Sequence, residues 1–199
     1  MSYAIAHPEI LKETVASRKG TTMKIVMLYD QIQSGLGAKD DRNLPLGILK
    51  EPVGPAIMME SLLKQVGGKV VATLYCGWGT YDDNPDEVAR KLVAMCHKIN
   101  PDVVMCGPTF NYAEYAEMAC RVASDIEAAG KIHALAAVSQ ENTDAIERYK
   151  DKVLIVKTPK KGGTGLNEAL KNMCLVAKAL VDGSWWIHIH RQKTGTLSS

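Results

Sequence analysis

Short runs of consecutive apolar residues alternate along this chain with longer segments of helical periodicity. The runs are apolar at successive positions rather than at every second one, which predicts strands buried on both faces, as in parallel sheets. Glycine and proline bound most of the runs and set their limits. The predicted strands are Lys24–Tyr29, Lys69–Tyr75, Asp102–Cys106, His133–Val138 and Lys152–Lys157.

Apolar residues in the intervening segments recur at the spacing of one helix face. After Asn84-Pro85, for example, Val88, Leu92 and Ile99 share a face, with Asn84 as the expected N-cap and Pro85 at the first helical position. Glycine ends several of these segments, as it does at helix C-termini. The predicted helices run from Pro55 to Gly67, from Pro85 to about Ile99, over about Tyr112–Ala129, over Thr143–Tyr149 and over about Leu166–Val181.

Strand–helix alternation through five cycles predicts an α/β fold. We expect a doubly wound, mainly parallel five-stranded sheet with helices on both faces, of the flavodoxin-like or Rossmann-like kind. Residues 23–183 are expected to form a single α/β domain, preceded by an N-terminal helical extension over 1–22 and followed by a C-terminal tail over 184–199. The connection over residues 30–54 is long for a compact domain, and loops of that length are usually functional.

Composition narrows the classes of partner. The net charge is only +2, and no basic run carries interleaved aromatic residues, so we expect no nucleic-acid partner. No stretch approaches the roughly 20 apolar residues that cross a bilayer, and the N-terminus lacks a signal-peptide pattern, so we expect no membrane association. The five cysteines are scattered among apolar residues, which is typical of reduced thiols and predicts a cytoplasmic protein.

No metal or cofactor is expected. The cysteines lack CxxC spacing, and the one close histidine pair, His188 and His190, has no third ligand nearby in the sequence. These histidines belong to the segment SWWIHIH, in which we expect Trp185 and Trp186 to pack the tail against the domain or against a second subunit. A homo-oligomer is therefore expected.

In open α/β sheets, ligands bind beyond the carboxyl ends of the strands, and that rule selects the candidate site residues. Cys76 and Cys106 each end a predicted strand and precede glycine. One interpretation is a catalytic thiol near a helix N-terminus, where the helix dipole lowers the thiol pKa. The other is a small apolar residue that packs at the end of a strand.

The turn Gly107-Pro108-Thr109-Phe110-Asn111 is the most unusual of the segments that end a predicted strand, because glycine and proline follow the strand directly. Glycine allows close approach of a ligand to the backbone, and proline restricts the exit from the strand. Asn111 is interpreted either as the N-cap of the next helix or as a carboxamide that binds a small carboxylate or carbonyl. The predicted ligand-binding residues are Gly35, Gly37, Gly77, Gly107, Thr109, Phe110 and Asn111.

A second glycine-rich segment, KKGGTG, opens the last predicted helix. Backbone N–H groups at a helix start form a cradle for anions, and Lys160 and Lys161 add positive charge, so these lysines with Gly162 and Gly163 form a candidate anion site. The order of residues is not that of a Walker A loop. The alternative is a flexible turn whose lysines are solvated.

At these same loops the chain resembles the glycine/sarcosine/betaine reductase component B selenoprotein subunit family. The resemblance rests on YDQIQSGLGAKDD, EPVGPAIMMESLL, VVATLYCGWGTY, PDVVMCGPTFNYAEYAEMAC and VLIVKTPKKGGTGLNEALKNMCLVAKALVDG, in that order. The corresponding family stretches have a G-x-G connection, a GPVGP helix start, a strand ending in CG and a GPAFN-x-x-x-Y turn.

The resemblance implies reductive cleavage of the C–N bond of glycine or its N-methylated relatives in anaerobic amino-acid fermentation, with a selenolate that attacks the α-carbon and partner subunits that take part. In the family, the selenocysteine/cysteine motif lies in a later half to which nothing here corresponds. The chain therefore resembles the N-terminal domain alone.

The function expected from this is a component B-like protein that binds a small amino-acid-like or carboxylate ligand at the C-terminal ends of the strands. If it is catalytic, it contributes to reductive C–N bond cleavage as one component of a reductase complex with partner subunits. A non-catalytic ligand-binding or assembly subunit is the first alternative. A flavodoxin-like nucleotide or flavin binder is the second, although the first strand–helix turn lacks a compact phosphate loop.

Overall fold

The computed structural model describes residues 21–183. Most of the predicted N-terminal extension and all of the predicted tail, with Trp185, Trp186, His188 and His190, lie outside the described residues. The division of the chain into one domain with two extensions therefore stays a prediction.

The core of the molecule is one mixed sheet of six strands in the order β2-β3-β1-β4-β5-β6. Every neighbouring pair is parallel except β2 with β3, which is antiparallel. The predicted α/β class and the mainly parallel sheet are confirmed, whereas the predicted count of five strands is wrong. The strands are β1 Met23–Tyr29, β2 Gly47–Leu49, β3 Gly68–Tyr75, β4 Val103–Cys106, β5 His133–Ser139 and β6 Leu154–Thr158.

Strand β2 is the missing strand, and it lies inside the long connection over residues 30–54. It has only three residues, too few to show a periodic pattern. Its pairing with β3 depends on a contact that is distant in sequence: Gly47 faces Tyr75, whose hydroxyl would lie 2.3 Å from a Cβ at position 47. No local signal carries that information.

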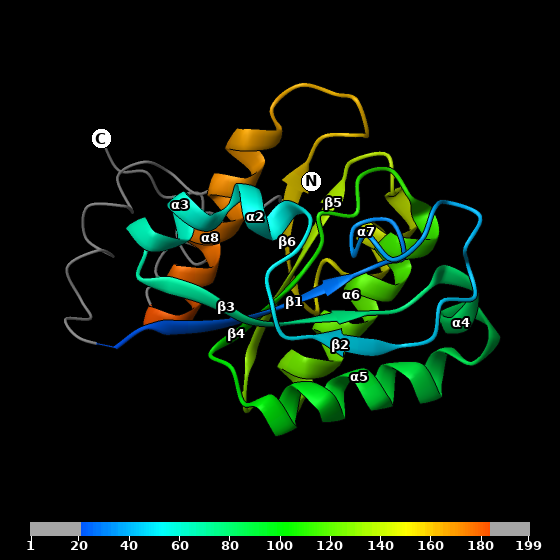
Figure 1. Ribbon diagram of the computed structural model, residues 1–199, viewed down its shortest axis with the longest axis horizontal. Helices are drawn as coiled ribbons and strands as arrows, with labels where there is room; N and C mark the ends of the chain where they lie inside the picture. The colour runs from blue at the N-terminus through cyan, green and yellow to red at the C-terminus, as the bar shows by residue number, and fades with distance from the viewer. Residues whose placement is uncertain (1–20, 184–199) are drawn as a thin grey trace.

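Helices cover both faces of the sheet, as the sequence predicts (Figure 1). Apolar side chains of α4, α5, α6 and α7 pack on one face, and those of α2, α3 and α8 pack on the other. The helices are α2 Pro55–Met58, α3 Glu60–Gln65, α4 Trp78–Asp83, α5 Pro85–Ile99, α6 Ala113–Ala129, α7 Thr143–Tyr149 and α8 Leu166–Asp182.

Two helix predictions need correction. The single helix expected from Pro55 to Gly67 is two short helices separated by the fully buried Met59, whose backbone stays in the right-handed helical region at φ −85° and ψ −8°. The segment after β3, expected as a loop, contains the six-residue helix α4. Gly79 inside this helix argues against helix formation by propensity, and tertiary contacts described below override that preference.

The strand order creates a switch point between β1 and β4. The chain leaving β1 leads to α2 and α3 on one face, and the chain leaving the adjacent β4 leads to α6 on the other face. In open α/β sheets the two connections diverge at such a point and leave a crevice that ligands use. The carboxyl ends of β1 and β4 are therefore the first place to look for a site.

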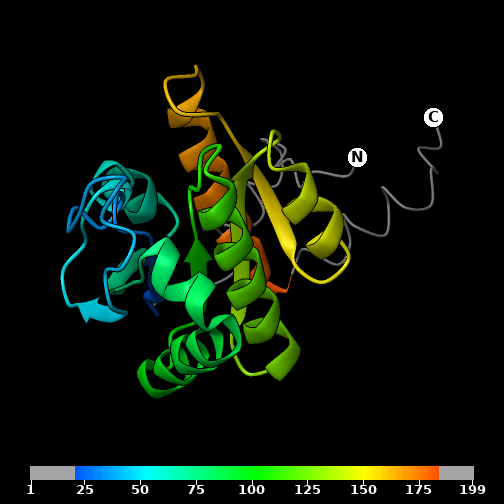
Figure 2. The same cartoon turned by 90° about the vertical axis from the view of Figure 1, so that its right-hand side faces the viewer.

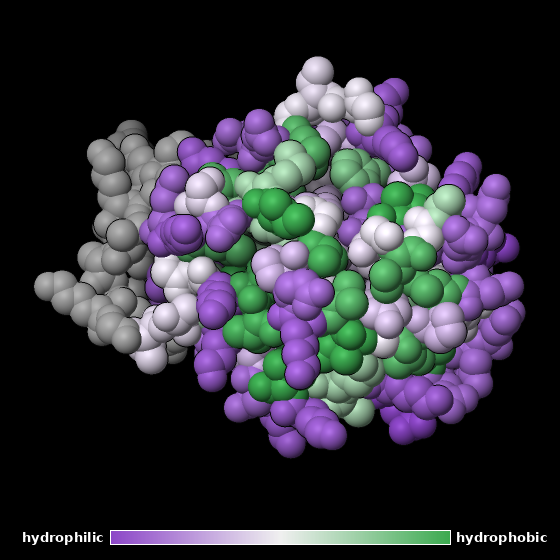
Figure 3. All heavy atoms as spheres, in the orientation of Figure 1, coloured by the Kyte–Doolittle hydropathy of each residue, from purple (hydrophilic) through white to green (hydrophobic). Residues whose placement is uncertain are grey.

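Figure 3 shows hydrophobic residues gathered in the middle of the face that carries β2, with hydrophilic residues around them. Ile48 of β2 and Ile57 and Met58 of α2 are the exposed large apolar residues of these two elements. Within residues 21–183, no helix combines the length and the apolar content that crossing a bilayer requires.

Candidate functional site

The two predicted thiols lie at the same edge of the sheet. β3, β1 and β4 are parallel neighbours, so Cys76, directly after β3, and Cys106, at the end of β4, lie at the carboxyl edge with β1 between them. Both side chains belong to the apolar cluster on the α4–α7 face. Neither is paired with another cysteine.

Both thiols are completely buried, and burial raises the pKa of Cys76 to about 12 and that of Cys106 well above its ordinary value. A nucleophilic cysteine needs its thiolate, which these environments disfavour at neutral pH. The arrangement is that of two small apolar residues in a core. The catalytic role of Cys76 and Cys106 stays a prediction, and their surroundings do not favour it.

A buried carboxylate joins the loops after β1 and β3. Asp30 follows β1, is fully buried, and accepts hydrogen bonds from the indole Nε1 of Trp78 at 2.9 Å and from the backbone N–H of Gln33 at 2.7 Å. Burial raises the pKa of Asp30 above its ordinary value, and these hydrogen bonds partly offset that rise. Gln31 adds a second tie, because its Oε1 accepts from the backbone N–H of Trp78 at 3.2 Å.

The N-terminus of α4 is occupied by the chain's own carbonyl groups. The carbonyl of Arg42 accepts from Gly79 N–H at 2.7 Å, and that of Leu44 accepts from Gly77 N–H at 2.9 Å. A Cβ at Gly77 would lie 2.3 Å from the Arg42 carbonyl oxygen, so Gly77 is required for this close approach. The predicted ligand-binding glycine therefore has a structural role here.

Gly107 has a similar role at the end of β4. Its φ is +135°, and a Cβ would lie 2.4 Å from the Ala137 carbonyl oxygen of the neighbouring strand. That same carbonyl accepts from the N–H of Thr109 at 2.9 Å, and Thr109 is fully buried. The Phe110 carbonyl accepts from Asn142 Nδ2 at 2.7 Å, with Phe110 itself at φ 51°. The turn is thus fixed against β5 and its following loop.

Asn111 lies at the surface and bonds to a distant loop. Its Oδ1 accepts from the backbone N–H of Lys161 at 2.9 Å. The residue at the N-cap of α6 is Tyr112, which provides no side-chain cap, so the interpretation of Asn111 as the N-cap is wrong. The Tyr112 ring lies 5.2 Å from that of Trp78, and Lys161 Nζ lies 5.8 Å from its centroid.

The remaining predicted residues lie in more open positions. Gly35 is exposed with φ +75° and nothing within 4 Å of a Cβ, whereas a Cβ at Gly37 would lie 2.7 Å from that of Asp41. In the predicted anion segment, Gly162 is exposed with φ +74°, again with nothing within 4 Å, and the half-buried Gly163 donates its N–H to the Lys160 carbonyl at 2.9 Å.

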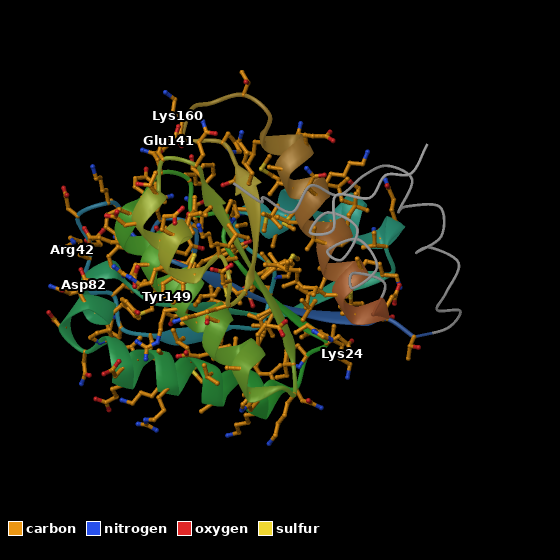
Figure 4. The ribbon with its side chains drawn as sticks, turned by 180° about the vertical axis from the view of Figure 1, so that it is seen from behind. Lys24, Arg42, Asp82, Glu141, Tyr149 and Lys160 are labelled. Carbon is orange, nitrogen blue, oxygen red and sulfur yellow. The ribbon has the colours of Figure 1, made fainter. Side chains whose placement is uncertain are left out.

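Charged side chains surround this edge. Figure 4 shows Glu141 and Lys160 at the same end of the molecule, far from Lys24 at the start of β1. The Ser139 hydroxyl donates to Glu141, and this bond and the charge of Lys160 lower the Glu141 pKa.

Arg42, in the loop after β1, pairs with Asp82 of α4 and Glu114 of α6 and so ties that loop to both helices. Within residues 21–183, no group of three or more histidine, cysteine or acidic side chains is placed to hold a metal ion.

Sequence reasoning assigned no role to Asp30, Trp78 or Tyr112, which join these loops, or to Glu141, which accepts a hydrogen bond from Ser139 at the same edge. Asp30 and Glu141 do carry a signal, because Asp30 directly follows a predicted strand and Glu141 comes three residues after another, where side chains reach the carboxyl edge. The contact between Trp78 and Tyr112 carries none, because it joins loops that are distant in the sequence.

Comparison with known proteins identifies a family and relatives to which the chain is similar. Residues 22–193 match the family model described as glycine/sarcosine/betaine reductase selenoprotein B. A glycine reductase complex component B subunit gamma from Symbiobacterium thermophilum is 31% identical over 104 residues, 52% of this chain and 24% of that protein. A sarcosine reductase complex component B subunit beta from Peptoclostridium acidaminophilum is 26% identical over 156 residues, 78% of this chain and 35% of that protein.

The matched region thus spans only about a quarter to a third of the length of these two relatives, 24% and 35%. No solved structure matches the chain. Because the family model covers residues 22–193, far more than half of the sequence, the chain belongs to the glycine/sarcosine/betaine reductase selenoprotein B family.

Proposed function

We propose that this chain is a component B-like protein that binds a small amino-acid-like ligand at the carboxyl edge of its sheet. The observation that carries the proposal is the joining of four loops at that edge. The loops after β1 and β3 meet through Asp30 and Trp78, and the loops after β4 and β6 meet through Asn111 and Lys161. Contact between the Trp78 and Tyr112 rings links the two pairs.

The charges at this edge suit a ligand that carries both a carboxylate and an amine. Lys160 and Lys161 are exposed cations beside the start of α8, where backbone N–H groups favour negative charge. Glu141 is an exposed carboxylate near Lys160, and its lowered pKa keeps it ionised at neutral pH. A cation and an anion in one region match the two ends of an amino acid.

The relatives named above are subunits of reductase complexes, which supports other reductase subunits as partners of this chain. In this proposal a partner carries the nucleophile for C–N cleavage, because all five cysteines here are buried. The same burial supports a second candidate, a non-catalytic ligand-binding or assembly subunit. The two candidates differ in whether the ligand is consumed when partner subunits are added.

The flavin alternative has one supporting observation. The five parallel strands, taken in chain order, lie in the order 2-1-3-4-5, which flavodoxin-like sheets also have. We therefore include a check for flavin, in which purified protein with an absorbance band near that of a flavin would favour this alternative.

The direct test is calorimetric titration with glycine, sarcosine and betaine, with acetate as the carboxylate that lacks an amine. We expect at least one of the three to bind more tightly than acetate. Glu141→Gln should weaken that preference, while the exposed Glu147→Gln, which lies on α7, should leave it unchanged. Equal binding of acetate and the amino acids, or no binding at all, would contradict the proposal.

A further inference from the structure

The connection between β6 and α8 extends beyond the body of the molecule. Figures 1 and 2 show it projecting from the top of the fold in two perpendicular views. It consists of residues 159–165, and five of these seven residues are exposed: Lys160, Lys161, Gly162, Thr164 and Gly165. Few contacts therefore hold it in place.

The glycines of this segment can act as hinges. Gly162 and Gly165 have φ of +74° and +91°, and a Cβ at either would meet nothing within 4 Å. Glycine reaches both signs of φ at little cost, so the backbone at these two positions can change conformation without a steric barrier from a side chain. The Gly165 carbonyl accepts from the N–H of Ala169 at 3.0 Å, so this end of the segment is anchored to α8. Because Gly162 directly follows Lys161, a change of backbone conformation at these glycines alters the path of the segment between Lys161 and the start of α8.

One residue fastens the segment to the rest of the edge. The N–H of Lys161 donates to Asn111 Oδ1 at 2.9 Å, and Lys161 Nζ lies 5.8 Å from the centroid of the Tyr112 ring. Both partners belong to the turn after β4, although β5 lies between β4 and β6 in the sheet. The segment thus reaches across the end of β5 to make this contact.

The residue directly before this segment is Thr158. Thr158 ends β6 and is 1% exposed, and its Oγ1 has no hydrogen-bond partner among the described residues. A buried hydroxyl without a partner costs free energy that another arrangement of the neighbouring chain, or water, can recover.

We infer that Pro159–Gly165 is a lid over the carboxyl edge, hinged at its glycines and fastened through Lys161 to Asn111 and Tyr112. The occupant of the edge that the lid would enclose rests on the proposed function, but the fastening itself does not. Opening breaks one exposed hydrogen bond and one cation–π contact, both weak in water, so the lid opens readily. Closure brings the charges of Lys160 and Lys161 over the edge.

The test is limited trypsin digestion, with cleavage after Lys160 and Lys161 followed by mass spectrometry. Cleavage follows the population of the open segment when opening is fast. We expect Asn111→Ala to raise the cleavage rate about fivefold, the factor that one neutral hydrogen bond supplies. Asn111→Asp keeps an acceptor oxygen, and its charge strengthens the bond to the Lys161 N–H, so this variant should be cleaved no faster than the parent. The exposed Asn167→Ala, on α8, is the matched control and should also leave the rate unchanged.

A second measurement does not depend on any variant folding. In the unaltered protein, amide hydrogen exchange at Lys161 should be slower than at Gly162, because only the Lys161 N–H is bonded to Asn111. Equal exchange at the two amides, or an unchanged cleavage rate in folded Asn111→Ala, would overturn the lid.

Adding glycine, sarcosine or betaine separates the lid from the proposed function. Slower cleavage of the parent protein with any of the three supports both. Faster cleavage in Asn111→Ala with no protection by any of the three supports the fastening and counts against the proposed ligand. Calorimetric binding of one of them without any effect of Asn111→Ala on cleavage supports the ligand and overturns the lid.

Discussion

Two pairs of glycines at the same edge of this sheet have opposite surroundings. Gly77 and Gly107 lie against backbone carbonyl oxygens of the chain itself, with a Cβ at 2.3 Å and 2.4 Å. Gly162 and Gly165 have nothing within 4 Å of a Cβ. Both pairs look alike in sequence, as glycines in loops after buried strands. At the first pair the backbone of the protein itself occupies the space that a side chain would need. At the second pair that space is open.

The comparison teaches where a ligand can approach the backbone. At Gly77 and Gly107 the space that a missing side chain creates is already filled by Arg42 and Ala137. Between β6 and α8 the glycines border open space next to two exposed lysines. A ligand that uses exposed backbone N–H groups therefore finds them after β6 rather than after β3 or β4.

The largest effect is expected for Gly107→Ala. The added methyl meets the Ala137 carbonyl oxygen at 2.4 Å, and φ of +135° is unfavourable for alanine, so overpacking and backbone strain add. We expect a loss of about 4 kcal/mol in the free energy of unfolding. Urea denaturation measures it. A loss below about 1 kcal/mol would show that the β5 backbone yields and that the site is not tightly packed.

Trp78→Phe is expected to have the next largest effect. Phenylalanine keeps much of the apolar ring but cannot donate to Asp30, whose carboxylate then loses the hydrogen bond from the indole and keeps the one from the Gln33 N–H. The expected cost is about 2–3 kcal/mol, as for hydrogen bonds to charged groups. Tyr112→Phe is the control, because it keeps the ring contact with residue 78. Equal stability of Trp78→Phe and the parent would mean that the bond to Asp30 contributes nothing.

Gly162→Ala is expected to cost far less. Nothing opposes the added methyl, and only the positive φ of 74° disfavours alanine, which amounts to about 1 kcal/mol. The same urea experiment compares it with Gly107→Ala. If the two variants lose equal stability, the contrast between the packed and the open glycines fails.

The smallest effect is a change in pH dependence. The pKa of Asp30 is raised in the folded state, so the folded protein holds this proton more firmly than the unfolded chain. Its contribution to stability is therefore present at low pH and is lost as the pH rises through the folded pKa. Asp30→Asn removes this loss. Thermal unfolding from pH 4 to pH 7 should show the variant gaining relative to the parent as pH rises, and a constant difference would contradict it.

Local patterns along the chain suffice for the elements that sit in the middle of the fold. Runs such as that of β1 are apolar at successive positions because both of their faces are covered by helices. The fifteen-residue helix α5 begins at Pro85 after Asn84, as predicted, because proline is favoured in the first helical turn and the apolar positions recur on one face. The positions of Cys76 and Cys106 at strand ends could also be predicted, because the apolar runs of two strands end at or directly before them.

Only the tertiary structure decides what those loop residues do. Strand β2 exists because it pairs with β3, and α4 forms because carbonyls from residues 42 and 44 bond to its first N–H groups. Asn111 bonds to Lys161, fifty positions away, rather than capping its own helix. Whether a loop glycine faces a carbonyl or open space depends on neighbours that are distant along the chain. The sequence therefore determines the position of each glycine, and the tertiary structure determines its role.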